Sequence, residues 1–330
     1  MATFVGQYTA YLLKITGVLP IGVCYGMLGD NLPPPSEVIA LYKVSNFEAM
    51  RLYNANHKVL QTLKGSNIQL LLGVPNELLQ SFASDANAAN AWIQTNVVSY
   101  SADINFRYVA VGNEVIPGDL AQYVLPAMEN IKNALALAGL QNTIKVSTAV
   151  AQVVLGSSFP PSAGAFSSDV QQTLGPITQF LASIEAPLLV NAYPYFAYAS
   201  NPADVRLDYA MFTAKDAVVV DGPFNYTNLF DAIVDAFYYA LERVGGEKVG
   251  IVVSETGWPS AGGTDTTVDN AQTYNSNLFK HAEQGTPKRP GSMETYIFAM
   301  FNENQKPPGV EQNWGLFYPD KKPVYPIISF

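Results

Sequence analysis

Cysteine and histidine, which often bind metals or serve as nucleophile and base, are scarce in this sequence. Its 330 residues include one cysteine and two histidines. Cys24 lies inside the apolar run IGVCYG, where a buried and unreactive thiol is expected. His57 and His281 lie in different segments, without a second nitrogen or sulfur ligand at a metal-binding spacing, and each is expected on the surface of a helix. The sequence therefore predicts no metal site.

Basic charge is also in short supply. Lys and Arg number 18 against 27 Asp and Glu, which gives a formal net charge of −9 and a pI near 4.7. A protein that binds nucleic acid needs clustered basic residues to displace counterions, so no nucleic-acid partner is expected. One Lys/Arg cluster, TPKRPG at 286–291, is flanked by prolines and predicts a solvated loop, with a contact patch as the alternative.

Long apolar runs are missing after residue 20. No later stretch reaches about 18 uninterrupted apolar residues, so no membrane-spanning helix is expected. Residues 1–20, MATFVGQYTAYLLKITGVLP, differ from the rest of the chain, and their first charge is Lys14, in the middle of what would be the apolar part of a secretory leader. A leader and an extra N-terminal segment both stay open for 1–20. One domain is expected over 21–330.

Eight short apolar runs recur along the chain and predict eight strands. Helical periodicity lies between them, as in LAQYVLPAMENIKNALALAGL, which ends at Leu140, and NLFDAIVDAFYYALERVGG, which ends at Gly246. Strands that alternate with helices in eight units predict an α/β fold, a single-domain (β/α)8 TIM barrel. No G-x-G-x-x-G follows the first strand, so an open dinucleotide-binding sheet is disfavoured and no cofactor is expected. The runs are IGVCYG from 21, FEAMRLY from 47, IQLLLGV from 68, FRYVAVGNE from 106, IKVSTAV from 144, PLLVNAYPY from 187, VGIVVSE from 249 and ETYIFAMFN from 294.

Three of these runs lead into a carboxylate, and barrel enzymes build their active sites at the carboxyl ends of the strands. Glu114 and Glu255 end the fourth and seventh runs, and Glu303 directly follows the eighth. A lone glutamate in such a place is more often a helix cap or a solvated side chain. We expect the fourth and seventh strands on opposite sides of the ring, with Glu114 and Glu255 facing each other across its mouth. Paired carboxylates in a cleft are what glycoside hydrolysis requires.

Other hydrolytic and transfer chemistries lack their motifs. There is no G-x-S-x-G elbow, the two histidines offer little for a Ser-His-acid triad, and no P-loop occurs. Hydrolysis of a glycoside by two glutamates is therefore favoured.

Segments around these glutamates resemble a known family. VGNE at the fourth strand, VSETGWPSAGG at the seventh and FAMFNENQKPPGVEQNWGLFYPD at the eighth closely resemble plant β-1,3-glucanases of glycoside hydrolase family 17, and the likeness extends over 21–330. The resemblance implies a retaining endo-hydrolase of (1→3)-β-D-glucan, with Glu255 as nucleophile and Glu114 as general acid/base. It also implies that Glu303, Lys306 and Glu311 support this pair, and that Asn113 hydrogen-bonds the sugar 2-hydroxyl.

A cation close to the nucleophile favours its ionised form, which is the role expected for Lys306; the alternative is a surface loop lysine. Flat aromatic rings near strand ends can stack on sugars, although several must belong to the core. We expect Tyr53, Tyr193, Phe196 and Phe301 to bind substrate. The full set of aromatic residues near strand ends is Tyr53, Tyr193, Tyr195, Phe196, Phe301 and Trp314.

Two positions depart from the pattern that the resemblance leads us to expect, because Asn54 and Ala151 stand where family members often carry Asp. The catalytic pair is intact, but the cleft has lost negative charge. The alternative to an active enzyme is therefore a weakly active β-glucan-binding protein on the same barrel.

The resemblance also bears on where the protein acts. An acidic chain of this type is expected to be a secreted monomer of the extracellular space or cell wall, rather than of the vacuole, with a role in plant defence or in the cell wall. Asn225, in the sequence Asn-Tyr-Thr, is a candidate N-glycosylation site.

Overall fold

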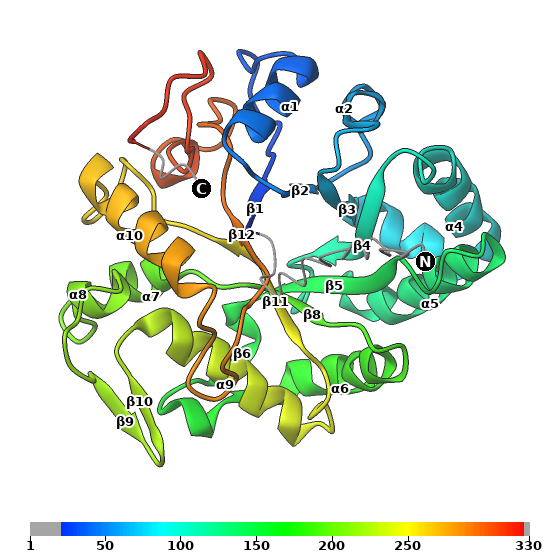
Figure 1. The fold of residues 1–330 in the computed structure, drawn as a ribbon. Helices are drawn as coiled ribbons and strands as arrows, with labels where there is room; N and C mark the ends of the chain where they lie inside the picture. The colour runs from blue at the N-terminus through cyan, green and yellow to red at the C-terminus, as the bar shows by residue number, and fades with distance from the viewer. Residues whose placement is uncertain (1–20, 327–330) are drawn as a thin grey trace, which may run out of the picture.

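The computed structural model describes residues 21–326, which form a closed barrel of eight parallel strands surrounded by helices (Figure 1). All eight predicted strands are confirmed, and so is the (β/α)8 barrel. The alternatives for residues 1–20 lie outside the described residues. The barrel strands are β1 (Ile21–Cys24), β2 (Ala49–Leu52), β3 (Gln69–Val74), β4 (Asn105–Asn113), β5 (Lys145–Ala151), β8 (Leu188–Asn191), β11 (Ile251–Thr256) and β12 (Thr295–Ile297).

The ring order of the strands is β1-β12-β11-β8-β5-β4-β3-β2. The fourth and seventh barrel strands, β4 and β11, are therefore separated by only β5 and β8, and the expectation that they lie on opposite sides was wrong. In a ring of eight, the strand opposite the fourth is the eighth, here β12. The side chains at the ends of β4 and β11 consequently lie on one arc of the mouth.

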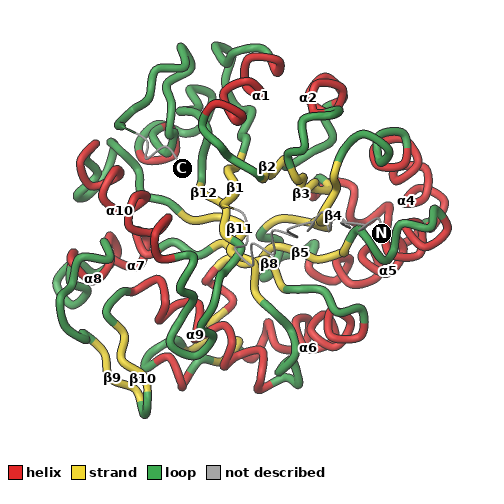
Figure 2. The backbone as a smooth tube through the Cα atoms, viewed as in Figure 1, coloured by secondary structure: helices red, strands yellow, loops and turns green. Residues whose placement is uncertain are grey.

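Helices surround the ring of strands, as Figure 2 shows by colour. Side-chain caps begin some of them: the Asn228 side chain accepts a hydrogen bond from the Asp231 N–H at the start of α9, and Thr267 accepts one from the Asn270 N–H at the start of α10. The helices are α1 (Pro35–Val44), α2 (His57–Leu63), α3 (Leu79–Ser84), α4 (Ala86–Ile93), α5 (Ala121–Leu137), α6 (Ser168–Ser183), α7 (Pro194–Ser200), α8 (Leu207–Ala210), α9 (Leu229–Arg243) and α10 (Val268–His281).

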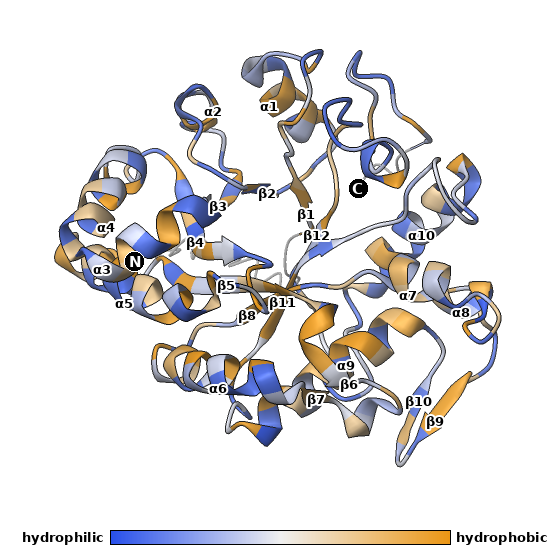
Figure 3. Cartoon of the chain, turned by 180° about the vertical axis from the view of Figure 1, so that it is seen from behind, coloured by the Kyte–Doolittle hydropathy of each residue, from blue (hydrophilic) through white to orange (hydrophobic). Residues whose placement is uncertain are grey.

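Two small antiparallel hairpins lie outside the barrel and were not predicted. One pairs β6 (Leu155–Ser157) with β7 (Ala165–Phe166), and the other pairs β9 (Val219–Asp221) with β10 (Phe224–Tyr226). Strands of two or three residues are too short to show a hydrophobic alternation, so no pattern indicated them. Figure 3 shows β9 as a hydrophobic segment at the edge of the molecule and β11 as one near its centre.

A buried polar cluster occupies the amino-terminal end of the barrel. The Glu294 carboxylate, 1% exposed, accepts hydrogen bonds from Tyr108 Oη at 2.9 Å and from Tyr296 Oη at 3.0 Å. Arg107 Nη2 lies 2.8 Å from Glu294 Oε2, and its Nη1 donates to Gln69 Oε1. These residues stand at or near the starts of β3, β4 and β12, so the cluster lies at the base of the barrel, at the end opposite the carboxyl ends of the strands.

The predictions for the cysteine and the two histidines have mixed outcomes. Cys24 is buried as predicted, and burial raises the pKa of its thiol to about 12. His57 lies exposed at the start of α2, also as predicted. His281, however, is only 17% exposed, and its Nε2 lies 2.6 Å from Asp231 Oδ1. Its surface assignment was wrong because α10 packs this end against α9.

The predicted solvated loop at 286–291 is instead tied to the helix beside it. Lys288 Nζ lies 3.0 Å from Glu242 Oε2 and 3.7 Å from the centre of the Tyr239 ring, and its side chain is 12% exposed. Arg289 Nη2 donates to the same carboxylate at 2.9 Å. Both cations are thus used within the chain.

Two further observations on the described residues concern metal ligands and helix length. Within residues 21–326, no group of three or more His, Cys, Asp or Glu side chains is arranged to hold a metal ion. No helix over the same range is long and apolar enough to cross a membrane.

Candidate active site

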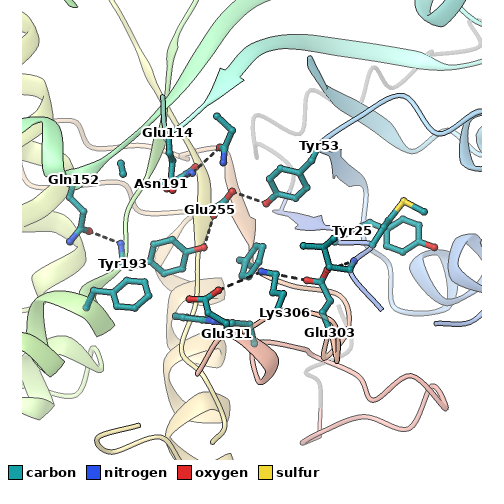
Figure 4. Close-up of a pocket in the computed structure, with 18 of the residues that line it drawn as sticks. Tyr25, Tyr53, Glu114, Gln152, Asn191, Tyr193, Glu255, Glu303, Lys306 and Glu311 are labelled. Atoms are coloured by element: carbon teal, nitrogen blue, oxygen red, sulfur yellow. Dashed lines mark hydrogen bonds and ion pairs between the residues drawn. The ribbon is translucent and has the colours of Figure 1, made fainter. Parts of the chain in front are cut away.

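A cavity of about 730 Å³ opens at the carboxyl ends of the barrel strands (Figure 4). It brings together charged residues that are far apart in the sequence, and every charged residue predicted for the site lines it. These are Glu114, Glu255, Glu303, Lys306 and Glu311.

Glu255 is the most tightly held of the carboxylates. It lies within β11, is 6% exposed and receives three hydrogen bonds. Tyr53 Oη and Arg51 Nη1 donate to Oε1 at 2.7 and 2.9 Å, and Tyr193 Oη donates to Oε2 at 2.7 Å. Every partner is a donor, which suits a carboxylate anion and fixes its orientation in the cavity.

Arg51 is the cation at this carboxylate, and sequence reasoning missed it. It is 1% exposed, and its Nη1 also donates to Asn191 Oδ1 at 3.0 Å and to the Ser254 carbonyl at 2.9 Å. Its Nη2 donates to Asn113 Oδ1 at 2.6 Å. The signal was present: a charged residue in the middle of the apolar run FEAMRLY must point into the barrel or away from it, and an inward arginine needs buried acceptors.

Glu114 directly follows β4 and has a left-handed backbone, with φ of 55°. Its Oε1 accepts a hydrogen bond from Asn191 Nδ2 at 2.8 Å. The surrounding walls of the cleft remove solvent from this carboxyl group and so raise its pKa, and the nearby charge of Glu255 raises the pKa further. The two glutamates thus sit in unlike environments: Glu255 is surrounded by donors, whereas Glu114 is biased toward its protonated form.

Asn191, at the end of β8, lies between the two glutamates and was also missed. It is fully buried, and its Nδ2 donates to Glu114 Oε1 and, at 3.1 Å, to Asn113 Oδ1. Its Oδ1 accepts from Arg51 and from Ser254 Oγ. An asparagine inside the run PLLVNAYPY looks like a break in a buried strand, and its role appears only when β8 is placed between β5 and β11.

Lys306 pairs with the other two glutamates of the cavity. Its Nζ is 3.6 Å from Glu303 Oε2, 3.7 Å from Glu311 Oε2 and 4.2 Å from the centre of the Phe298 ring. The cation in contact with Glu255 is Arg51. The expected role of Lys306 near the nucleophile stays a prediction, but its surface-loop alternative was wrong, since the Lys306 side chain is 14% exposed.

Glu303 does not directly follow a strand, because β12 ends at Ile297. The loop that carries Glu303 folds back over the cavity end of the barrel. Glu303 Oε1 accepts a hydrogen bond from the Leu28 N–H at 2.7 Å, and Glu303 is 3% exposed. It therefore joins the loop after β1 to the loop after β12.

The aromatic predictions separate into three groups. Tyr53 and Tyr193 line the cavity, but each donates its hydroxyl to Glu255. Phe196 lines the cavity and is 41% exposed, so its ring is available for stacking. Phe301 was assigned wrongly: it is 1% exposed, packs against Tyr25 and Phe317, and does not line the cavity.

The two aromatic residues left undecided by the sequence also differ. Tyr195 is buried against Trp258 and belongs to the core. Trp314 lines the cavity but is 3% exposed, with its ring centre 5.1 Å from that of Tyr193. Trp314 thus supports the cavity wall.

A family model matches most of the chain. Residues 21–328 match the family model described as Glycosyl hydrolases family 17. This chain belongs to glycosyl hydrolase family 17. A glucan endo-1,3-beta-glucosidase of Vitis vinifera is 55% identical over 316 residues, covering 94% of this chain and 92% of that protein. Lichenase-2 of Hordeum vulgare is 50% identical over 307 residues, covering 93% and 97%.

Solved structures agree with this family 17 assignment. One, from work on two plant beta-glucan endohydrolases with distinct substrate specificities, matches with a TM-score of 0.92 at 50% identity and covers 94% of this chain and 100% of that one. A beta-1,3-glucanase and allergen of Cryptomeria japonica pollen matches with a TM-score of 0.91 at 48% identity, covering 94% and 99%. The family resemblance noted from the sequence is confirmed.

Asn54 and Ala151, the two departures noted in this family 17 chain, both line the cavity. Neither carries charge, so the negative charge of the cavity comes from its glutamates. Both side chains therefore lie where they can alter the binding of a substrate, and an activity assay measures their effect on turnover.

A substitution at Gly26 tests the contact between the loop after β1 and Glu303. A Cβ at position 26 would lie 2.2 Å from Glu303 Oε2, so Gly26→Ala must displace that carboxylate and its ion pair with Lys306. We expect a loss of about 10-fold or more in kcat/KM on a β-glucan with little change in secondary structure, measured by reducing-end assay and circular dichroism. Gly250→Ala is the control, because a Cβ there meets only Pro187 at 4.0 Å. Equal activity of the two variants would show that Glu303 is not needed where it lies.

Proposed function

We propose that this chain hydrolyses internal (1→3)-β-D-glucosidic bonds of β-glucan by a retaining double displacement, with Glu255 as nucleophile and Glu114 as general acid/base. The observation that carries the proposal is the contrast between the two glutamates of one cavity: three donors orient Glu255, while desolvation and the charge of Glu255 raise the pKa of Glu114. A retaining enzyme needs one ionised and one protonated carboxyl group.

In the first step, Glu255 attacks the anomeric carbon while the Glu114 proton passes to the departing glycosidic oxygen. The C–O bond to the leaving chain breaks and an ester bond to Glu255 forms. In the second step, Glu114, now ionised, takes a proton from water, and the resulting hydroxide displaces Glu255 from the sugar. We expect the two carboxyl groups about 5 to 5.5 Å apart, because a gap of about 6.5 to 9.5 Å would admit a water and imply inversion.

Other residues have proposed supporting roles. Asn113 Oδ1 accepts from Arg51 and Asn191, so its Nδ2 is the atom to donate to the sugar 2-hydroxyl. Glu303, Lys306 and Glu311 form a charged group beside Phe298 that can bind sugar hydroxyls and add to the field around the pair. Tyr53 and Tyr193 are proposed to hold Glu255 as well as to contact substrate, and Phe196 to stack on a sugar face.

The (1→3) linkage is proposed because the Vitis vinifera relative is named a glucan endo-1,3-beta-glucosidase. The 50% identity to a protein named lichenase gives a specific competitor, a mixed-linkage β-glucan. The cavity departures Asn54 and Ala151 keep the weakly active binding protein as a further alternative.

Purified protein incubated with laminarin and, separately, with mixed-linkage β-glucan decides among these. Rapid appearance of mixed oligosaccharides from laminarin, before glucose accumulates, is the expected result for internal cleavage. Steady release of glucose with little early fall in viscosity would refute the internal mode of attack. Faster hydrolysis of the mixed-linkage glucan would overturn the linkage, and binding of laminarin without new reducing ends would favour the binding protein.

We also propose a secreted, monomeric glycoprotein of the cell wall, active in defence or wall remodelling. Relatives from Nicotiana are named basic vacuolar isoforms, whereas this chain has a net charge of −9. Asn225 lies exposed on β10, as a glycosylation acceptor must. Recovery of the protein from cell-wall fluid of the source tissue, rather than from isolated vacuoles, is the expected result.

A further inference from the structure

The last residues of β4 have an irregular backbone, and they extend beyond the point where the neighbouring strand β3 ends. β3 pairs with β4 up to Val74 and Val111 and then leaves the sheet at Pro75. β4 continues for two more residues, through Gly112 with φ of 84° to Asn113, and is followed by Glu114 with φ of 55°. The main chain of Asn113 therefore has no strand beside it on the β3 side.

The side chain of Asn76 takes the place of the missing strand. Its Oδ1 accepts the N–H of Asn113 at 2.8 Å, and its Nδ2 donates to the carbonyl of Asn113 at 2.9 Å. One side-chain amide thus supplies both the acceptor and the donor that a neighbouring strand would supply from two peptide groups. On the other side, Asn113 is in register with Ala149 of β5, and the Glu114 N–H donates to the Ala149 carbonyl at 2.9 Å.

Asn113 separates Asn76 from the carboxyl groups that are proposed to react. Asn76 does not line the main cavity, but borders a smaller one of about 260 Å³ shared with Asn113 and Arg51. Without Asn76, the donor and acceptor of Asn113 lose their partners on one side, and the left-handed turn at Glu114 is held only from β5. A carboxyl group must lie within about 0.5 Å of its working position to transfer a proton to a departing oxygen.

We infer that Asn76 is a positioning residue for the general acid: it fixes the main chain at Asn113 and thereby the direction in which Glu114 points. This inference rests on the proposed role of Glu114. It assigns to Asn76 no contact with substrate and no part in holding Glu255, which is fixed by Tyr53, Tyr193 and Arg51.

The test compares Asn76→Ala with Asn130→Ala in the full chain. Asn130 is half-buried like Asn76, and its Nδ2 donates to the carbonyl of Phe82 at 2.7 Å, a bond between α5 and α3 away from the cavity. Both variants lose an asparagine amide that holds a main-chain group. Urea unfolding of each variant measures the effect on stability apart from the effect on activity.

Two substrates distinguish positioning of the acid from a general loss of structure. On laminarin, whose leaving sugar needs a proton, Asn76→Ala is expected to lower kcat/KM by about 10- to 100-fold. On a dinitrophenyl β-laminaribioside, whose leaving group needs no proton, kcat/KM reports formation of the glycosyl-enzyme and is expected to fall by a much smaller factor, the remaining loss coming from the contact of Asn113 with the sugar 2-hydroxyl. Asn130→Ala is expected to leave both values unchanged.

Equal losses on the two substrates, or unchanged activity on laminarin, would overturn the inference. Glu114→Gln, measured beside it, separates this failure from failure of the proposed function. If Glu114→Gln shows the substrate difference and Asn76→Ala does not, Asn76 is not the positioning residue. If Glu114→Gln itself shows no difference, the role of Glu114 is wrong.

Discussion

Glu255→Gln is expected to lower kcat/KM on every β-glucan substrate by on the order of 10⁴-fold or more, because an amide cannot form the ester to the sugar. Glu114→Gln is expected to lose about 10²- to 10⁴-fold on laminarin, and far less in the first step on a dinitrophenyl glycoside. Initial rates on both substrates, with a rapid-mixing measurement of dinitrophenol release, check the difference.

Glu129→Gln, on the exposed face of α5, is the matched control and should retain full activity. The division of roles fails if both active-site variants lose the same factor on the activated substrate. It is reversed if Glu114→Gln is the variant that is inactive on both.

The second large effect is expected on stability. Arg51→Met should lower the free energy of unfolding by about 3 to 5 kcal/mol. Arg51 is 1% exposed, and its removal leaves the carboxylate of Glu255 buried without its cation. Arg51→Lys should recover part of the loss, because an ammonium group supplies the charge but not the forked donors that reach Glu255, Asn191 and Asn113 together. Urea unfolding curves give these free energies.

A double-mutant cycle sharpens this prediction. Arg51→Met combined with Glu255→Gln removes both charges, so the double variant should lose less stability than the two single losses added together. Arg206→Met, which breaks an ion pair with Asp208 at a 60% exposed side chain, should cost no more than about 1 kcal/mol. Additive losses at Arg51 and Glu255 would mean that their contact contributes little.

The barrel was predictable because its strands are buried on both faces and therefore appear as unbroken apolar runs. The same rule explains what was missed. The β6–β7 and β9–β10 hairpins are too short to form a pattern, and ring position cannot be read from run order without counting steps around the closed sheet. The prediction that β4 and β11 lie on opposite sides of the ring was wrong for that reason.

The site was predictable where a charged side chain follows an apolar run, as Glu114 does. Arg51 and Asn191 were not found because they lie inside such runs, and a polar residue there has meaning only once its buried partners are known. Phe196 and Phe301 have the same chemistry and both lie near strand ends. Only the packing of the loops decides that Phe196 borders the cavity and Phe301 lies in the core.

The polar cluster around Glu294 has a consequence for the fate of the glycosyl-enzyme. Glu294 and Tyr296 are almost fully buried at the base of the barrel, whereas the cavity opens at the carboxyl ends of the strands. We expect water to arrive through the same mouth that admits the polymer, along the part of the cavity that the departing fragment has just left. Any sugar hydroxyl that enters first competes with water for the ester. At high oligosaccharide concentration, we expect the balance between cutting chains and joining them to depend on how fast that part of the cavity empties.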